Sequence, residues 1–244
     1  MSDERISMPF WRYYGGKWRA APHYPAPRHA TIVEPFAGEA GYSLRYHDRQ
    51  IILVEKYPVL AEMWRWLIAA SAAEVIAIPT VEHVDDLPSW VPEGARYLVG
   101  FSMNDACVSP KRQLSAGRKR LASMGRRFEG WNENRREMTA RQSQLIKHWT
   151  IMEGDYSQCP DVEATWFVDP PYNNKVGACY VHGPGAINYH DLGAWCRDRM
   201  GQVIVCENEG ADWLDFHPFA TLKAGINGKG SREVVWTNPM EDGA

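Results

Sequence analysis

The chain has few of the features that mark disulfide-rich, zinc-binding or membrane-spanning proteins. Its five cysteines are odd in number, widely spaced and never form a Cys-x-x-Cys pair, so we expect neither a disulfide framework nor a zinc ribbon. The eight histidines show no His-Glu-x-x-His or similar ligand spacing. No window approaches the roughly 18 uninterrupted apolar residues of a membrane span, and residues 1–10 are too acidic for a signal peptide. These absences predict a soluble cytoplasmic protein with no metal cofactor and no membrane partner.

What the chain does contain is enough apolar material for one well-packed core. Of its 244 residues, 45% are hydrophobic, 23% are charged and 11 are tryptophan, a composition typical of folded domains and not of disordered chains. Short apolar runs of strand type alternate with segments of helical spacing. The sequence therefore predicts an α/β fold, a sheet with helices on both faces. The apolar runs are residues 31–33, 51–54, 165–168 and 202–205.

Helices and a hairpin are expected around these runs. Each of the first two runs should lead into a helix, and the second of these helices is expected to extend from Pro58 to Ala73. Apolar residues at helical spacing between Tyr189 and Met200 predict another helix, with Gly201 as its C-terminal cap. Near the end of the chain, residues 219–223 and 233–237 flank a glycine-rich loop, which predicts a closing hairpin.

Positive charge is concentrated in one segment. Residues 111–147 hold eleven Lys or Arg against three Glu, a net charge of +8, whereas the rest of the chain carries −11. Such asymmetry is typical of a surface that binds a polyanion, and aromatic and amide side chains interleave with the basic ones. A solvated helical face is the alternative. The interleaved residues are Phe128, Trp131, Asn132 and Asn134.

The strongest chemical signal is the tetrapeptide Asp169-Pro170-Pro171-Tyr172, which directly follows an apolar strand. In an α/β sheet this is the edge at which ligands bind. The amino nitrogen of adenine is a poor nucleophile because its lone pair is delocalised into the ring. The Asp169 carboxylate and the Pro170 carbonyl can each accept an N–H bond and favour the positive charge that develops on that nitrogen. The prolines fix the backbone, and Tyr172 offers a face on which a base can stack.

A second signal is a glycine-containing turn after the first strand. Residues 32–42 run from a strand through Gly38 and Gly41 into the next element, and glycines at such a turn allow close approach of a ligand to the backbone. Glu55 ends the next strand about 20 residues later, where a carboxylate commonly holds the ribose hydroxyls of a nucleoside. Taken singly, Glu55 could equally be a surface acid.

These motifs, in this order, resemble those of the Dam-like family of DNA adenine methyltransferases over most of the chain. Residues 13–17 (Tyr-Tyr-Gly-Gly-Lys) are similar to the family's N-terminal motif that contacts the cofactor, and residues 34–41 to its cofactor-binding loop. Residues 154–156 resemble the segment whose acid faces the cofactor's adenine, residues 169–172 the catalytic loop, and residues 232–238 the closing strand. One position departs from the pattern, because Ala40 stands where the loop usually has a glycine.

The resemblance implies a Rossmann-like methyltransferase sheet that binds S-adenosylmethionine, formed by residues 1–79 and 149–244. It implies that residues 80–148 form an inserted, mainly helical target-recognition lobe. The expected reaction is direct in-line methyl transfer to the N6 nitrogen of an adenine flipped out of double-stranded DNA. The expected catalytic residues are Asp169, Pro170, Pro171 and Tyr172, and the expected cofactor-binding residues are Tyr13, Lys17, Glu34, Phe36, Ala37, Gly38, Glu55, Asp155 and Tyr156. The expected DNA-binding residues are Lys111, Arg112, Arg118, Lys119, Arg120, Arg126, Arg127, Arg135 and Arg136.

Other interpretations of the same residues remain open at this stage. Lys17 could be a surface lysine, and Asp155 could cap a turn. The substrate could be RNA or a protein glutamine amide, although the acid at position 169 favours a base because glutamine methyltransferases typically have Asn there. A nucleic-acid-binding relative that has lost catalysis is a further alternative. A solitary enzyme of a bacterial or phage-infected cell and a partner in restriction-modification are both compatible with the sequence.

Overall fold

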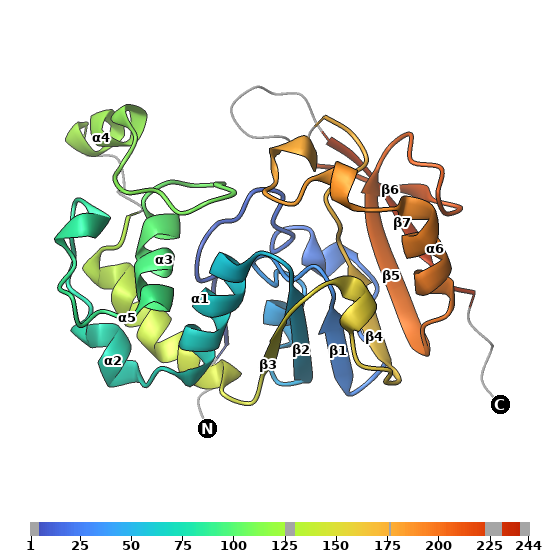
Figure 1. Ribbon diagram of the computed structural model, residues 1–244, viewed down its shortest axis with the longest axis horizontal. Coiled ribbons are helices and arrows are strands. Elements are labelled where there is room, and N and C mark those ends of the chain that lie inside the picture. Colours follow the sequence, from blue (N-terminus) through green and yellow to red (C-terminus); the bar gives the residue numbers. More distant parts are fainter. Residues whose placement is uncertain (1–4, 125–129, 176, 223–230, 240–244) are drawn as a thin grey trace.

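A seven-stranded mixed sheet, flanked by helices, forms the centre of the computed structural model, which describes residues 5–124, 130–175, 177–222 and 231–239 (Figure 1). The strand order is β3-β2-β1-β4-β5-β7-β6. The first five strands of this order are parallel, and β7 pairs antiparallel with both β5 and β6. The strands are β1 (Thr31–Glu34), β2 (Gln50–Glu55), β3 (Thr150–Glu153), β4 (Ala164–Val168), β5 (Gly201–Asn208), β6 (His217–Leu222) and β7 (Ser231–Thr237).

The parallel strands form where the sequence has continuous apolar runs, because both faces of this part of the sheet are covered. Val33 of β1 lies beside Ile52 of β2 on one side and Trp166 of β4 on the other, and all five residues of β4 are buried. The predicted strands at β1, β2, β4 and β5 are confirmed, as is the closing hairpin of β6 and β7. The glycine-rich loop between the hairpin strands, residues 225–230, lies outside the described residues.

One strand, β3, was not predicted from the sequence. It is short and largely exposed, with only Ile151 half-buried, so it lacks the apolar run that identifies a buried strand. It is placed by its backbone pairing with β2, which aligns Leu53 with Ile151. The sheet therefore extends one strand further toward the helical end of the molecule than local patterning indicates.

Two predictions about helices are wrong in detail. The helix expected over 58–73 is two helices, α1 (Pro58–Ala69) and α2 (Ala72–Ala77), because the chain turns extended at Ala70 and Ser71 then caps α2 in a capping box with Glu74. The helix expected after β1 is only a 3₁₀ turn, η2 (Ser43–Tyr46).

Gly201 is not a helix cap. Helix α6 (Tyr189–Arg197) is capped by Asp198, and Gly201 begins β5 with φ +96°. A Cβ at this position would lie too close to the Ala164 carbonyl oxygen of β4, so glycine is required by strand pairing and not by the end of the helix.

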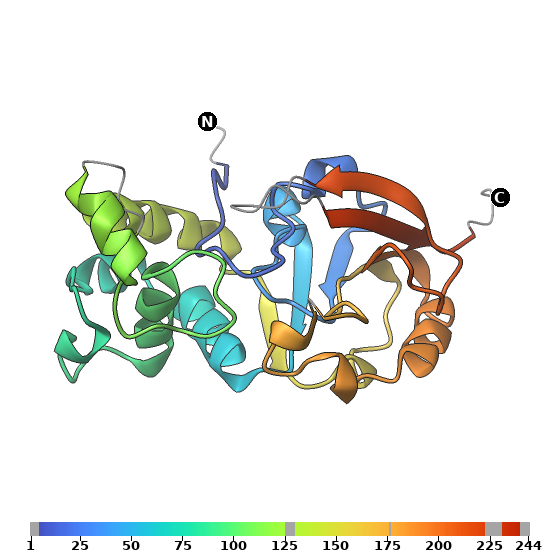
Figure 2. The same ribbon diagram turned by 90° about the horizontal axis from the view of Figure 1, so that it is seen from above.

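The remaining helices gather beside the β3 edge of the sheet, as both ribbon views show (Figures 1 and 2). Helix α1 packs against α3 (Glu93–Ser102), and α2 packs against α5 (Glu133–Gln142), while α4 (Ala116–Ser123) stands at the outer end. Short 3₁₀ turns complete the fold: η1 (Ala21–His23), η3 (Val84–Asp86), η4 (Ser143–Ile146), η5 (Tyr156–Gln158), η6 (Gly177–Cys179) and η7 (Pro184–Ala186).

The helical end and one face of the sheet share a core. Trp64 of α1 contacts Trp11 and Phe10 of the N-terminal segment and Trp149 before β3. The same buried cluster reaches Leu98 of α3. The division of the chain at residues 80 and 148 stays a prediction. Helix α2, which ends before residue 80, packs against α5, which lies within residues 80–148. Within the described ranges, no helix is long and apolar enough to cross a membrane.

Candidate active site

Two loops meet at the carboxyl ends of β1 and β4, which are neighbours in the sheet. The strand order runs one way from β1 to β2 and the other way from β4 to β5, and the crevice outside such a reversal is where open α/β sheets bind ligands. A pocket of about 830 Å³, including open solvent, lies there. The predicted site residues that line it are Tyr13, Lys17, Glu34, Phe36, Ala37, Gly38, Glu55, Asp155, Asp169 and Pro171.

The turn after β1 is held by the acid that ends β2. Glu55 accepts hydrogen bonds from the backbone N–H of Gly38 at 2.9 Å and of Tyr57 at 2.8 Å. Gly38 has φ +48° and Ala40 has φ +51°, so Ala40 adopts the left-handed conformation that glycine would adopt freely. The departure from the family pattern at Ala40 therefore leaves a tight turn in place, closed by the bond from Ala40 N–H to the Ala37 carbonyl.

An N-terminal arm, residues 12–18, lies across this turn. A Cβ on Gly41 would lie 2.5 Å from the backbone nitrogen of Trp18, and a Cβ on Gly16 would overlap the Glu39 carboxylate. Glu39 accepts the backbone N–H of Tyr13 at 3.0 Å and of Trp18 at 3.3 Å. The two glycines therefore allow close backbone approach, and Glu39 fastens both ends of the arm to the turn.

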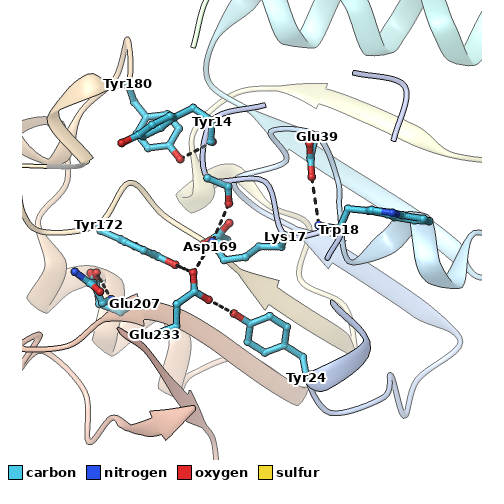
Figure 3. A network of polar contacts seen from close by, with 12 residues as sticks. Tyr14, Lys17, Trp18, Tyr24, Glu39, Asp169, Tyr172, Tyr180, Glu207 and Glu233 are labelled. Atoms are coloured by element: carbon cyan, nitrogen blue, oxygen red, sulfur yellow. Dashed lines mark hydrogen bonds and ion pairs between the residues drawn. The ribbon is translucent and has the colours of Figure 1, made fainter. Parts of the chain in front are cut away.

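The arm carries Lys17 into contact with Asp169 of the loop after β4 (Figure 3). Lys17 is only 4% exposed, and its Nζ lies 2.8 Å from Asp169 Oδ1 and 3.8 Å from Glu233 Oε1. It also donates to the Gly15 carbonyl at 3.0 Å. The interpretation of Lys17 as a surface lysine is therefore wrong, and its first partner is the predicted catalytic acid.

The loop of residues 169–173 is held by hydrogen bonds with neighbouring elements. The Tyr189 hydroxyl donates to the Pro171 carbonyl, and the Asn173 N–H donates to Glu207 at 3.2 Å. The Tyr172 hydroxyl donates to Glu233 at 3.0 Å, and the ring of Tyr172 faces Lys17 Nζ at 4.9 Å from its centroid. Pro170 is buried. Pro170 and Tyr172 are not among the pocket-lining residues, so Asp169 and Pro171 form the part of the loop that faces the pocket.

Burial raises the pKa of four acids that line the pocket. It raises the pKa of Asp169 to about 6, and the Lys17 ammonium opposes this shift. It likewise raises the pKa of Glu34 to about 8 and that of Glu39 to about 7, although each accepts backbone hydrogen bonds that act in the other direction. The Glu55 pKa is also raised by burial. Five acids and two lysines, Lys17 and Lys56, line the pocket, but at these pKa values Glu34 is largely protonated and Glu39 about half protonated at neutral pH, so the excess of negative charge is small.

Asp155 has two roles in the structure. It caps η5 by accepting the Ser157 N–H at 3.2 Å, as one interpretation expected, and it also lines the pocket, where it pairs with Lys56 at 2.8 Å. Burial raises its pKa, but the hydrogen bonds from Lys56 and Ser157 outweigh this and lower it. Tyr156 does not line the pocket but stacks on Phe36, which does, with ring centroids 5.7 Å apart.

The predicted DNA-binding residues divide into two groups. Lys111, Arg112, Lys119 and Arg120 are exposed, the last two on α4, while Arg118 is half-buried and pairs with Asp105. Arg126 and Arg127 lie outside the described residues, as does Phe128.

The other two predicted DNA-binding residues, on α5, have contacts inside the protein. Arg135 donates to the Phe10 carbonyl at 2.9 Å, and Arg136 donates to the Ile78 carbonyl at 3.3 Å. Trp131 is 1% exposed, so the expectation that it is available to stack on bases is wrong; it belongs to the core. Asn132 caps α5 through Arg135 N–H, which leaves Asn134 as the exposed amide.

Several site residues were missed by sequence reasoning. Tyr57 and Tyr180 line the pocket, as do Tyr14 and Glu39, which lie in the predicted segments 13–17 and 34–41 without being named as site residues. Glu207 and Glu233 accept hydrogen bonds from the loop of residues 169–173. A usable signal existed for the last two, since Glu207 directly follows the apolar run of β5 and Glu233 directly precedes that of β7, and a buried carboxylate requires partners. Among the described residues, no group of three or more His, Cys, Asp or Glu could hold a metal ion.

Comparison with protein-family models and with curated proteins found no match. Among solved structures, a conserved hypothetical protein from Streptococcus pyogenes is similar at 11% sequence identity, with 89% of each chain covered and a TM-score of 0.34.

Proposed function

We propose that this protein is an S-adenosylmethionine-dependent methyltransferase that methylates the N6 nitrogen of adenine in DNA. The observation that carries the proposal is the pocket at the junction of β1 and β4, in which the glycine turn and Asp169 face the same space. The parallel order β3-β2-β1-β4-β5 is that of a Rossmann-like sheet, and this junction is the position where such sheets bind nucleotides.

The residues present fit S-adenosylmethionine. Its sulfonium is cationic, and Asp169, which is largely ionised at neutral pH, lines the pocket together with Glu55. Glu55 lines the pocket beside the Gly38 turn, and its carboxylate would accept hydrogen bonds from the ribose hydroxyls. Phe36, on which Tyr156 stacks, would contact the cofactor through its aromatic ring. Bound there, the cofactor would supply an electrophilic methyl group. The assignment accounts for a buried carboxylate at Glu55 that faces the pocket and whose hydrogen bonds within the described residues come from backbone N–H groups and not from a cation.

Asp169 supplies the chemistry expected of a hydrogen-bond acceptor toward an amino group. Lys17 contacts one of its oxygens, Oδ1, so the other can accept an N–H from the substrate. With its pKa at about 6, Asp169 is largely ionised at neutral pH and favours the positive charge that develops on the amino nitrogen. The buried Pro170 and the Tyr189 contact to Pro171 limit movement of the loop during the reaction.

Nucleic acid is the substrate class that the remaining surface favours. Lys119 and Arg120 project from α4, with Lys111 and Arg112 on the preceding segment, and all four are exposed. Such side chains bind phosphates without reading sequence. An adenine within a duplex would have to be flipped out to reach a pocket at the edge of the sheet.

Two measurements test this function. Calorimetry should show S-adenosylmethionine binding that weakens at least about tenfold, or about 1.4 kcal/mol, in Glu55→Ala. The matched control is Glu153→Ala, an exposed acid that neighbours Glu55 in the sheet register and that should leave binding unchanged. Absence of cofactor binding would refute the proposal.

Transfer of labelled methyl from the cofactor should then be compared on duplex DNA, single-stranded DNA and structured RNA in competition. Preference for the duplex supports DNA as the substrate. Preference for RNA would keep the chemistry and replace the substrate, and no incorporation into any polymer despite cofactor binding would indicate a nucleic-acid-binding relative without catalysis.

A further inference from the structure

Glu233 is a buried acid that contacts both the catalytic loop and the lysine that pairs with it. It lies on β7, opposite Asn208 of β5, and is 5% exposed. Its Oε1 accepts the Tyr172 hydroxyl at 3.0 Å, and its Oε2 accepts the Tyr24 hydroxyl at 2.7 Å. Figure 3 shows it between these two rings. Glu233 is not among the pocket-lining residues.

The same carboxylate shares Lys17 with Asp169. Lys17 Nζ is 2.8 Å from Asp169 Oδ1 and 3.8 Å from Glu233 Oε1. One ammonium therefore lies between two carboxylates, and its position depends on the charge of both. Because Tyr172 faces this ammonium and donates to Glu233, the ring, the ammonium and the catalytic acid form one connected unit.

We propose that Glu233 is a positioning residue for methyl transfer, one that fixes the Tyr172 ring and draws Lys17 to one side of Asp169 so that the second oxygen of Asp169 stays available to the substrate amino group. This inference rests on the proposed function. It assigns a role in the reaction to a side chain that does not line the pocket.

The titratable groups around Asp169 and Glu233 determine how loss of the Glu233 charge should affect Asp169. Facing Asp169 and Glu233 are Lys17 and Tyr24 from the N-terminal segment, Glu34 and Glu39 from the β1 end, Cys206 and Glu207 from β5, and Tyr172 and Tyr180 from the segment after β4. Burial keeps the pKa of Tyr172 and of Tyr24 well above the ordinary value, so both remain hydroxyl donors. The negative charge of Glu233 is one of the causes that raise the Asp169 pKa.

Glu233→Gln removes that charge and keeps the size of the side chain, and its carbonyl can still accept one hydroxyl. We expect the Asp169 pKa to fall, which moves the acid limb of the kcat profile to lower pH. We also expect kcat at neutral pH to decrease about 10- to 100-fold through loss of orientation, with the dissociation constant for S-adenosylmethionine changed less than about threefold, since Glu233 does not line the pocket. A purely structural role would leave the acid limb where it is.

The test has a readout that does not depend on turnover. Carbon-13 NMR of the labelled protein without cofactor can follow the Asp169 carboxyl carbon through pH, with Asp169→Asn used to assign its signal. The control is Glu209→Gln, an exposed acid near β7 that pairs with Arg232 and should leave the titration and kcat unchanged. Tyr24→Phe removes one donor to Glu233 while the charge stays, and reports on folding around the site.

An Asp169 titration that falls in Glu233→Gln, together with the lower kcat, supports the proposal. An unchanged titration, or a loss of folding stability with normal kcat in the folded fraction, overturns it. If the wild-type protein transfers no methyl group, the proposed function fails first, and the NMR titration still decides whether Glu233 controls the charge on Asp169.

Discussion

The ammonium of Lys17 lies 2.8 Å from Oδ1 of Asp169, and this contact joins the N-terminal arm to the loop after β4. Lys17 is almost fully buried, so water screens the charges of this ion pair only weakly. Removing one partner of such a pair leaves an uncompensated charge, which is more costly than the pair itself.

Lys17→Met should therefore destabilise the fold by about 3–5 kcal/mol at pH 7. The pH dependence of this destabilisation follows from Asp169, because the Lys17 charge lowers the Asp169 pKa. Without the lysine that pKa rises, so Asp169 takes up a proton and the cost shrinks toward pH 5. Urea denaturation at pH 7 and at pH 5 measures this change in the free energy of unfolding. The double variant with Asp169→Asn should recover part of the loss, and equal stability of Lys17→Met and wild type would contradict the pairing.

Glu39 should behave as the fastener of the N-terminal arm. Glu39→Ala leaves two backbone N–H groups, of Tyr13 and Trp18, without their acceptor, which should cost about 1–3 kcal/mol for each group that stays buried. Limited proteolysis should then cleave within residues 12–18 sooner than in wild type. Equal cleavage rates would rule out the fastening role, and Glu209→Ala, an exposed acid, provides the control.

The pKa of Glu39, raised to about 7, also predicts a pH dependence. A carboxyl that binds its proton more tightly in the folded state favours folding at low pH, and this contribution is lost as pH rises from about 4.5 through 7. Glu39→Gln cannot titrate. The stability of wild type relative to Glu39→Gln should therefore decline over that window in denaturant titrations, and a difference that is constant with pH would contradict the burial of Glu39.

Ala40 has φ +51°, a conformation that costs a side-chain-bearing residue about 1–2 kcal/mol. Ala40→Gly removes this cost but adds freedom to the unfolded chain worth about 0.4–1 kcal/mol. Ala40 is 0% exposed, so glycine also gives up the burial of one methyl group, about 0.8 kcal/mol. We therefore expect the free energy of unfolding, from thermal or urea denaturation, to stay close to that of wild type. Ala73→Gly, in the ordinary helical backbone of α2, should lose up to about 1 kcal/mol, and a loss at both positions would argue against the left-handed turn.

The exposed basic residues of α4 should contribute to nucleic-acid affinity through salt-dependent contacts. Replacing Lys119 and Arg120 with Ala should weaken DNA binding and reduce the slope of log affinity against log salt by about 0.9 for each phosphate that the protein no longer neutralises. Arg136→Ala is the contrasting control, because this guanidinium donates to the Ile78 carbonyl, and its loss should lower stability by about 1 kcal/mol with the slope unchanged. Fluorescence anisotropy at several salt concentrations separates the two outcomes.

Sequence patterning was most informative where one local segment carries the signal. Strands β1, β2, β4 and β5 were predicted because burial on both faces demands unbroken apolar runs, and the loops after β1 and β4 were identified because their residues are consecutive. Strand β3 has no such run, and Gly201 was misassigned because a glycine after a helix serves caps and strand starts alike.

The interior of the site could not be predicted in the same way. Lys17 and Asp169, or Glu233 and Tyr24, are far apart in the chain, and no local periodicity reports their pairing. Trp131 and Arg136 lie in a segment whose positive charge predicts an exposed surface. The Trp131 indole is instead buried in the core, and the Arg136 guanidinium donates to the Ile78 carbonyl. Tertiary contacts decided these positions.

The most direct test of the proposed function is mass spectrometry of nucleosides from unmethylated genomic DNA incubated with S-adenosylmethionine and either wild type, Asp169→Ala or Asp169→Asn. We expect N6-methyladenine from wild type and a decrease of at least about 10³-fold in Asp169→Ala, because the acceptor for the amino N–H is gone. Calorimetry on the same preparations should show that all three proteins still bind the cofactor. A wild-type protein that binds the cofactor and forms no methyladenine, or an Asp169→Ala variant with near-normal turnover, would contradict the assignment.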